Sequence, residues 1–367
     1  MRAAIDKSSE PGLASSPAFS TNLPAFRRAL LRWYELHRRD LPWRHTSDPY
    51  RIWLSEVMLQ QTRVAAVLEH YRVFLERFPD VQTLAAASED QVLAAWSGLG
   101  YYRRARMLHQ CAIMIVQEHS GVFPQTSAAM LALPGIGRYT SAAIASIAFS
   151  EPIAVVDGNV ERVLRRVTGK IFNAAQAWNF AQQFLAKSRP GDFNQAMMEL
   201  GATVCVPRTP QCSSCPVRKW CATRGEVPRS VPRIQQQKKQ TWCSLEQRNG
   251  NANGNIYSQT SKNESGRCEV RLVQRSKNNA VMAGMWELPQ SSDPPSDLPD
   301  SAVWRTFRHC ITVTDYSVHV LRNNRQAGKR FPNALRGTKG KWIAADRIQH
   351  IPVTGLTRKI LKASGII

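Results

Sequence analysis

Apolar residues over the first 200 positions recur at helical spacing, and strand-like alternation is scarce there. Phe26, Leu30 and Trp33 fall on one stripe of a helix, and Leu36 or His37 continues it. Turns that contain Gly or Pro separate many of the following apolar segments, so we expect consecutive helices in an all-α domain. These helical segments are expected over residues 52–78, 89–96, 102–119, 127–133 and 139 to about 149.

The amino-acid composition and the apolar pattern of the sequence change after residue 223. Residues 224–240 combine two prolines, a glutamine run and basic residues, which predicts a linker. The polar stretch 246–266, rich in Asn, Ser and Gly, is expected to be a loop inserted at the surface. Strands are predicted over 270–274, 318–321 and 341–344, and a final turn and helix over 352–363.

These patterns predict a chain of four parts. Residues 1–24 mix Ser, Pro and Ala without periodicity, which is typical of a disordered tail. A helical domain over 25–223 follows, and then come the linker over 224–240 and a smaller α+β domain over 241–367. The chain has 367 residues, which is enough for two or three compact domains.

The charge balance is strongly basic, with 49 Lys and Arg against 27 Asp and Glu and a net charge of +22. Residues 1–225 hold 26 basic and 17 acidic residues (net +9), and residues 226–367 hold 23 and 10 (net +13). A basic surface throughout favours a polyanionic partner such as nucleic acid, although a solvated Lys and Arg surface would give the same count.

Neither a membrane anchor nor a secretion signal is expected. The apolar stretch 142–149 is interrupted by Ser146 and is far shorter than the ~20 residues that span a bilayer. The N-terminus carries Asp6, Lys7 and Glu10 and lacks an apolar signal core. We therefore expect a cytoplasmic protein, associated with the nucleoid if the source is bacterial.

Four of the eight cysteines form a cluster spaced C-x6-C-x2-C-x5-C. Such a cluster, in a chain without a secretion signal, predicts a metal site in a reducing compartment. Zinc and a [4Fe–4S] cluster both accept four cysteine ligands, and the spacing by itself leaves both open. The candidate ligands are Cys205, Cys212, Cys215 and Cys221.

A Gly-x-Gly turn joins two predicted helices in the segment LPGIGRYT (133–140). Gly135 and Gly137 would let main-chain N–H groups approach an anion, and the second helix adds its positive N-terminal end. This is how a protein holds a DNA phosphate without reading the base sequence. The alternative is an ordinary tight turn between two helices.

Two carboxylates stand out as candidates for chemistry. Asp157 precedes Gly158 and Asn159 after a buried apolar segment, some 20 residues behind the hairpin, so it either caps a helix or also points into a cleft. Glu56 lies in a helix among apolar residues, with Gln60 one turn further on the same face. Apolar neighbours disfavour the charged form of a carboxyl group, and a general acid must carry its proton before the reaction. A solvated helix glutamate is the alternative.

Together these pieces resemble the MutY-type adenine DNA glycosylases of the endonuclease III, or helix-hairpin-helix, superfamily. The resemblance runs from about Pro24 to Cys221 and ends in the cysteine cluster. Its motifs occur in order and at family spacing: LPWR (41–44), WLSEVMLQQT (53–62), GLGYYRRAR (98–106), LPGIGRYT (133–140), VVDGNVERV (155–163) and FNQAMMELGATVC (193–205).

The resemblance implies a division of labour between the carboxylates. Glu56 would protonate the extruded adenine at N7, and Asp157 would stabilise the sugar cation, with Asn159 positioning the carboxylate and water. Tyr139 stands where bifunctional relatives carry a lysine that attacks the sugar. Because tyrosine cannot form a Schiff base, we expect a monofunctional enzyme, with Tyr139 hydrogen-bonded near Asp157.

The resemblance also implies how the DNA is held. The adenine pocket would include Trp43, Arg44, Glu56 and Gln195, while Gln60, Gln61, Leu99 and Tyr101 would contact the DNA or fill the gap left by the base. Turn packing is the alternative for Leu99 and Tyr101. Phosphate contacts are expected from Arg103, Arg104 and Arg106, and solvated helix positions are the alternative for some of them.

The cofactor implied by the resemblance is a [4Fe–4S] cluster that clamps the 205–221 loop, with Arg208, Arg218 and Lys219 facing the DNA. The second domain resembles a Nudix-like domain that recognises 8-oxoguanine, on the segments 271–275, 284–289 and 307–309. Thr312 lies where many members carry a Phe-Ser-His turn, but the histidine is missing here. No Glu-rich Nudix box occurs between Pro289 and Phe307, so nucleotide hydrolysis is not expected.

The expected partner is double-stranded DNA with adenine opposite 8-oxoguanine or guanine, bound by a monomer. Two alternatives come from different classes. One is a bifunctional glycosylase and lyase of the endonuclease III type, which Tyr139 and the C-terminal domain disfavour. The other is a non-catalytic iron–sulfur DNA-binding protein, which the presence of both carboxylates disfavours.

Overall fold

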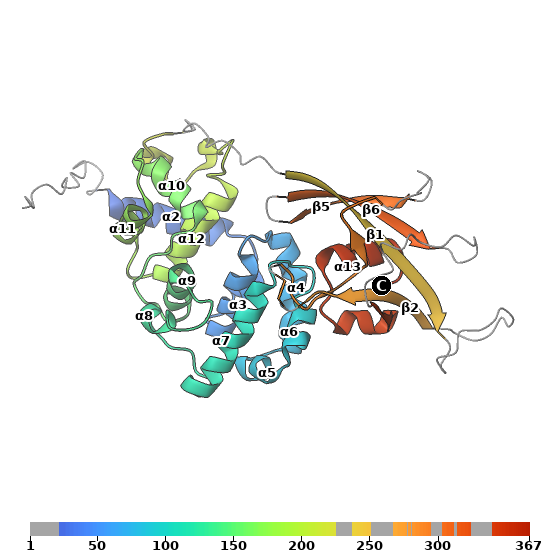
Figure 1. The fold of residues 1–367 in the computed structure, drawn as a ribbon. Coiled ribbons are helices and arrows are strands. Elements are labelled where there is room, and N and C mark those ends of the chain that lie inside the picture. Colours follow the sequence, from blue (N-terminus) through green and yellow to red (C-terminus); the bar gives the residue numbers. More distant parts are fainter. Residues whose placement is uncertain are drawn as a thin grey trace, which may run out of the picture. The chain divides into compact units, whose positions relative to one another are not determined.

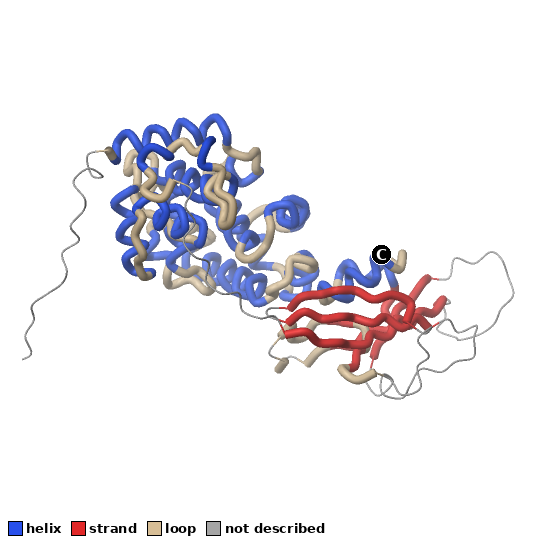
Figure 2. The backbone as a smooth tube through the Cα atoms, turned by 90° about the horizontal axis from the view of Figure 1, so that it is seen from above, coloured by secondary structure: helices blue, strands red, loops and turns tan. Residues whose placement is uncertain are grey.

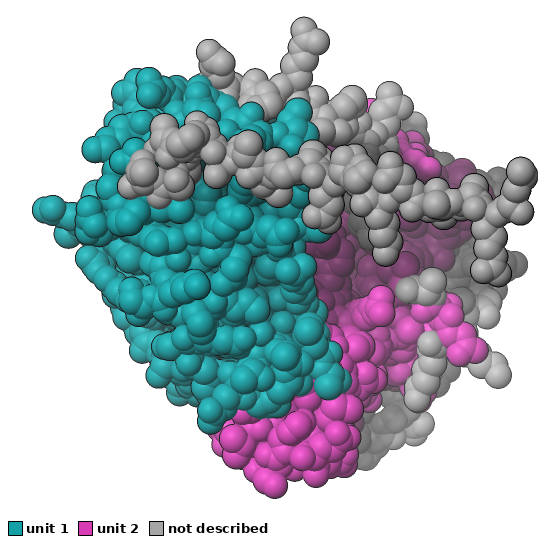
Figure 3. Space-filling model, turned by 90° about the vertical axis from the view of Figure 1, so that its left-hand side faces the viewer, with its two compact units in different colours: residues 1–53, 124–132, 136–230 teal, residues 54–123, 133–135, 231–367 magenta. Residues whose placement is uncertain are grey.

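The computed structural model divides into two compact units, coloured separately in Figure 3. The first comprises Met1–Trp53, Pro124–Ala132 and Ile136–Ser230, and the second comprises Leu54–Phe123, Leu133–Gly135 and Val231–Ile367. The structure describes residues 22–224, 237–250, 267–276, 278–279, 281–294, 303–311, 314–323 and 340–367. All described strands follow residue 236, so the first predicted domain is helical as expected (Figure 2).

The first unit is built around the apolar face of its first helix. Phe26, Leu30 and Tyr34 of that helix are almost fully buried and join one core with apolar residues of the three later helices α10, α11 and α12. The spacing of these residues gives one apolar stripe, which is the pattern of a helix packed on one side. Its elements are α2 (Leu23–His37), η1 (Pro42–Arg44), α8 (Ser127–Met130), α9 (Arg138–Ala148), α10 (Gly158–Thr168), α11 (Ala174–Phe184), α12 (Pro190–Thr203), η2 (Cys212–Ser214) and η3 (Arg218–Trp220).

Helix α3 (Pro49–Leu59) begins in the first unit and ends in the second. The helices that follow it in the second unit begin at side chains suited to capping. Asp80 accepts a hydrogen bond from the Thr83 N–H at the start of one helix, and Ser88 with Gln91 forms a capping box at the next. These helices are α4 (Val64–Arg77), α5 (Val81–Ala86), α6 (Glu89–Ala95) and α7 (Arg103–His119).

The C-terminal sheet has the order β3-β2-β1-β6-β5 among the described strands, with β4 paired to β1 and β7 paired to β2. The long strand β1 pairs in parallel with β6 along its first ten residues and antiparallel with β2 at its end. The strands are β1 (Gln237–Gly250), β2 (Arg267–Gln274), β3 (Trp286–Glu287), β4 (Gln290–Ser291), β5 (Val303–Ile311), β6 (Thr314–Asn323) and β7 (Gly340–Ala344).

The final helix α13 (Gly355–Ala363) completes this domain after the 3-10 helix η7 (Ala345–His350). Its residues Leu356, Ile360 and Leu361 share one core with apolar residues of the sheet, and in Figure 1 the helix lies beside β1 and β2. The second domain is therefore an α+β domain with its own core, as predicted. Within the described residues, no helix combines the length and apolar character needed to cross a membrane.

Several predicted boundaries are wrong, and each error has a local cause. The first helix starts at Leu23, inside the predicted tail, because Pro24 is tolerated in a first helical turn. The helix predicted over 52–78 is two helices, and Gln60 lies in the turn between them.

The start of the sheet domain was also misplaced. Strand β1 begins at Gln237, within the predicted linker, and runs to Gly250, within the predicted surface loop. Both the predicted linker and the predicted loop were inferred from polar composition. A strand is held by main-chain hydrogen bonds, so it can carry polar side chains on the face of the sheet that meets solvent.

Candidate active site and cysteine pocket

Glu56 lies in a segment of helix α3 that is buried on every side. Residues 52–58 of α3 are all buried, and Glu56 itself is only 7% exposed. A helix buried on every side normally carries apolar residues, and a carboxyl group there is costly unless it has partners. The interpretation of Glu56 as a solvated surface glutamate is therefore wrong.

Asp157 is the N-cap of α10, and its two carboxylate oxygens have different partners. One accepts a hydrogen bond from the Val160 N–H at 2.7 Å, and the other accepts one from the Asn159 side-chain amide at 2.9 Å. Burial raises the pKa of Asp157, and these hydrogen bonds partly oppose that shift. The carboxylate thus caps the helix and also accepts a hydrogen bond from Asn159.

Asn159 connects Asp157 to the cysteine loop through one arginine. The Asn159 side-chain oxygen accepts a hydrogen bond from Nη2 of Arg162 at 2.8 Å, and Nε of Arg162 donates to the main-chain oxygen of Cys205 at 2.9 Å. Arg166, one turn further along α10, donates to the same Cys205 oxygen and lies 3.3 Å from its sulfur. The orientation of Asp157 therefore depends on a chain of contacts that ends at the first cysteine of the cluster.

The predicted hairpin lies between α8 and α9. Gly135 has a φ of +75°, and a Cβ there would come within 2.7 Å of the Met107 side chain, so glycine is required on both counts. Gly137 is the N-cap of α9, is exposed and would place a Cβ in open space, so a ligand can reach this helix start.

Tyr139 follows in the first turn of α9. Its hydroxyl lies 3.4 Å from the sulfur of Met198 on α12, within the same unit. Its expected hydrogen bond near Asp157 stays a prediction.

Glu199, which was not among the residues predicted for the site, binds Arg44 of the predicted base pocket. The Glu199 side chain is fully buried, and its Oε2 lies 2.6 Å from Nη2 of Arg44 and 2.7 Å from Nη2 of Arg39. Burial raises its pKa, but the hydrogen bonds from Arg39 and Arg44 outweigh burial and bring the pKa to about 2. Arg44 is thereby fixed beside the buried Trp43. An acidic residue among Met197, Met198 and Leu200 in α12 was the available signal.

Gln195 lies on α12 one turn before Glu199 and is half-buried. Three of the four residues predicted for the base pocket, Trp43, Arg44 and Gln195, therefore lie in the first unit, and Glu199 shares that unit.

The turn between α6 and α7 carries the residues predicted to enter the duplex. Gly98, Gly100 and Tyr101 all have positive φ, and Tyr101 is 49% exposed while Leu99 is buried. Gln61, in the turn after α3, also has a positive φ and is exposed. Left-handed conformations at non-glycine residues are uncommon and cluster at functional sites.

The predicted phosphate contacts need correction. Arg104 donates to the main-chain oxygens of Val57, Met58, Leu99 and Gly100, and burial lowers its pKa to about 10. It holds the turn from inside the protein. Arg106 pairs with Glu89 at 3.0 Å, and of the three arginines only Arg103 is exposed.

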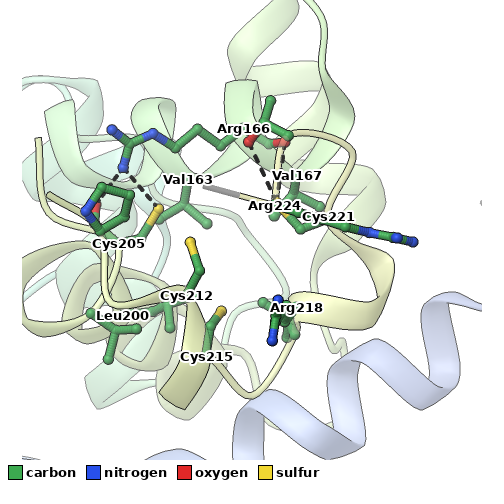
Figure 4. Close-up of a pocket in the computed structure, with 14 residues that line it drawn as sticks. Val163, Arg166, Val167, Leu200, Cys205, Cys212, Cys215, Arg218, Cys221 and Arg224 are labelled. Carbon is green, nitrogen blue, oxygen red and sulfur yellow. Dashed lines mark hydrogen bonds between the residues drawn. The ribbon is translucent and has the colours of Figure 1, made fainter. Parts of the chain in front are cut away.

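The four clustered cysteines line one pocket, drawn in Figure 4. Apolar side chains of α10 and α12, among them Val163 and Leu200, form its other walls, together with the basic residues Arg166, Arg218 and Arg224. Burial raises the pKa of the Cys215 thiol to about 11, and the neighbouring cysteines add to that shift. The remaining cysteines lie outside this pocket: Cys111, Cys243, Cys268 and Cys310.

In the second domain, the segments that suggested a recognition domain are parts of the sheet and its core. Arg271 lies on β2 and pairs with Glu246 of β1 at 2.8 Å, Met285 and Phe307 are buried, and His309 is half-buried on β5. Thr312, the candidate for reading the opposite base, lies outside the described residues.

Comparisons with known proteins find relatives of the helical part of the chain. The profile of the HhH-GPD superfamily base excision DNA repair proteins matches residues 54–175, a stretch that contains Glu56, the hairpin and Asp157. The solved structure of a thermostable thymine-DNA glycosylase is 30% identical, with a TM-score of 0.54, over 56% of this chain and 98% of that one. The chain belongs to the HhH-GPD superfamily.

Within the HhH-GPD superfamily, human "Adenine DNA glycosylase" is 48% identical over 218 residues, which cover 55% of this chain and 40% of the human protein. The chain thus spans less than half the length of that relative. An endonuclease III in a covalent complex with DNA shares the fold, with 21% identity and a TM-score of 0.50 over 56% of this chain and 96% of that one. The resemblance predicted from the motifs is confirmed.

Proposed function

We propose that the chain is a DNA glycosylase that hydrolyses the N-glycosidic bond of adenine mispaired with guanine or 8-oxoguanine in duplex DNA. The observation that carries the proposal is Asp157, a half-buried carboxylate oriented by Asn159 behind a helix-hairpin-helix. The 48% identity to human Adenine DNA glycosylase supports adenine as the base. The positive charge of the whole chain supports duplex DNA as the partner.

In the proposed reaction, the bond between N9 of adenine and C1′ of the sugar breaks, and its electron pair leaves with the base. Glu56 donates a proton to N7 of the extruded adenine, so the base departs as a neutral molecule. Asp157 faces the cation that develops at C1′. Water then adds to C1′ and gives up one proton to the Glu56 carboxylate, which restores the acid. That the carboxyl groups of Glu56 and Asp157 meet across one nucleotide stays a prediction.

The product of this reaction is an abasic site in an intact strand. Strand cutting by a glycosylase requires an amine that attacks C1′ and forms a Schiff base. Tyr139 stands at the position where such a lysine would act, and its hydroxyl cannot replace the amine. The enzyme is therefore monofunctional.

The hairpin and two turns of the second unit would position the DNA. The start of α9 at Gly137 offers a helix N-terminus to a backbone phosphate. Leu99 and Tyr101, with Gln61, would occupy the space left by the extruded base. Trp43, Arg44 and Gln195 would line the base pocket, with Arg44 held by Glu199.

The cysteine pocket fits a [4Fe–4S] cluster. Four cysteine sulfurs line the same pocket, and four cysteine ligands are the set that such a cluster takes. When bound, the cluster would cross-link the 205–221 loop to α10 through Cys205, Cys212, Cys215 and Cys221.

The C-terminal domain over 237–367 is proposed to be a Nudix-like domain that reads the base opposite adenine. Its separate core and its segments 271–275, 284–289 and 307–309 support this role. Thr312 keeps a hydroxyl at the reading position but lacks the neighbouring histidine. We therefore expect the preference for 8-oxoguanine over guanine to be built on fewer hydrogen bonds.

A single-turnover assay tests the proposed function. Duplexes with adenine opposite 8-oxoguanine, guanine or cytosine are incubated with the protein and then divided into samples with and without alkali. We expect strand breaks only after alkali, with the fastest rate opposite 8-oxoguanine. A duplex with a preformed abasic site serves as the control for lyase activity. Rapid strand cutting without alkali would contradict the monofunctional mechanism, and equal rates opposite 8-oxoguanine and guanine would contradict the recognition role.

Iron analysis tests the cofactor independently of activity. The purified protein should be yellow-brown and contain about four irons per chain. Cys212→Ser should lose most of this iron, whereas Cys310→Ser, a change in the exposed thiol of β5, should retain it. Zinc in place of iron in the wild-type protein would refute the assignment.

A further inference from the structure

Both ends of the turn between α6 and α7 bind one main-chain oxygen of the C-terminal domain. The Ser97 hydroxyl donates to the Val353 oxygen at 2.8 Å, and the Tyr102 hydroxyl donates to the same oxygen at 3.1 Å. Ser97 and Tyr102 are 3% and 4% exposed, so these hydrogen bonds are formed away from solvent. All of these residues belong to the second unit.

The Val353 oxygen is held in place by its own neighbours. Trp286 at the start of β3 donates its N–H to the Pro352 oxygen at 2.8 Å and accepts from the Thr354 N–H at 2.9 Å. Thr354 in turn caps α13 through the Thr357 N–H. The segment around Val353 is thus fixed to the sheet on one side and to the final helix on the other.

Arg358 adds a second contact to the same point. Its Nε donates to the Ser97 hydroxyl at 3.0 Å, so Ser97 accepts from α13 while it donates to Val353. On the other side of the turn, Arg104 binds the oxygens of Leu99 and Gly100 at 3.3 Å. Between these anchors the backbone φ is positive at Gly98 (+113°) and Gly100 (+69°), which glycine allows, and also at Tyr101 (+48°), where it is uncommon.

We propose that the C-terminal domain positions the turn that enters the duplex, through the Val353 oxygen and the hydroxyls of Ser97 and Tyr102. These two hydroxyls bracket Leu99 and Tyr101, the residues assigned to the space left by the extruded base, so the inference rests on the proposed function. The domain that is proposed to read the base opposite adenine would thereby also set the geometry of the turn that fills the space left by that adenine. Ser97, Tyr102 and Arg358 are positioning residues in this scheme.

Three full-length variants test the arrangement: Ser97→Ala, Tyr102→Phe and the double variant. Each substitution removes one hydroxyl from a buried acceptor, so amide hydrogen exchange over residues 98–101 should accelerate about tenfold. The excision rate should fall about tenfold in the double variant, with unchanged affinity for a matched duplex. A 2-aminopurine placed beside the mispair should report less unstacking.

Two changes in the same unit serve as matched controls. Ser244→Ala removes a fully buried hydroxyl from β1, and Tyr316→Phe removes a phenol hydroxyl from β6. Both should leave exchange, unstacking and excision as in the wild type. Wild-type exchange over 98–101 in the double variant, at an unchanged melting temperature, would overturn the proposal. If the wild type excises no adenine, the proposed function fails, while the exchange measurement still decides whether the two hydroxyls hold the turn.

Discussion

Replacing Asp157 by asparagine should slow adenine excision by about a thousandfold, because the transition state then loses the carboxylate that faces the sugar cation. Asparagine has nearly the same shape and is an equally good N-cap, so α10 should still begin at Gly158. The melting temperature should change little, and single-turnover kinetics should isolate the chemical step. A rate near that of the wild type would show that another group stabilises the cation.

Asp80→Asn is the matched control for this variant. Asp80 also caps a helix, since its side chain accepts the Thr83 N–H at the start of α5, but it lies at an exposed position outside the candidate active site. The same change of atoms at the same type of cap should leave excision at the wild-type rate. A comparable loss in both variants would mean that helix capping, and not the charge of Asp157, is what the reaction requires.

The pH dependence of excision gives a further readout of the same residue. Burial raises the pKa of Asp157 above the ordinary value of 3.8. Only the ionised form stabilises a cation, so the excision rate should fall as the pH drops through this raised pKa. The acidic limb of the wild-type profile should therefore lie above pH 3.8, and Asp157→Asn should lack it.

The sequence predicted the helical domain, the hairpin and the cap at Asp157 because each depends on local rules. Apolar spacing marks buried helix faces, Gly135 must adopt a positive φ, and an aspartate before a glycine commonly begins a helix. The apolar neighbours of Glu56 in α3 favoured its burial, while a solvated glutamate was the alternative that the structure excludes. These features are fixed within a few residues of the chain.

The features that were missed depend on partners far away in the chain. Glu199 meets Arg39 and Arg44 from a distance of about 160 positions, and nothing near it in sequence names those partners. Arg104 was predicted to contact phosphate because it stands in a basic run, but its guanidinium turns inward to four main-chain oxygens. The Val353 oxygen is part of the main chain, so no residue type could have indicated it.

Glu56→Gln should reduce excision by about a thousandfold while leaving duplex affinity intact, because an amide cannot supply the proton that the departing adenine requires. Glutamine keeps the size of the side chain in α3, where Glu56 is 7% exposed, and it is neutral like the protonated acid that it replaces. The melting temperature should therefore stay about the same. Loss of excision with retained binding would separate an enzyme from a protein that only binds DNA, since a pure binder would respond to this change in neither assay.

Glu118→Gln, on the exposed end of α7, is the appropriate comparison for this variant. Glu118→Gln removes a solvated negative charge, whereas Glu56→Gln replaces a protonated acid by a neutral amide, so any electrostatic gain in affinity for phosphate should be confined to Glu118→Gln. Only the change at Glu56 should alter the chemical step. If Glu56→Gln excises adenine at the wild-type rate, the proton comes from elsewhere, and the two-carboxylate mechanism does not hold. A thousandfold loss confined to Glu56→Gln and Asp157→Asn, with intact binding, would instead assign the chemistry to these two side chains.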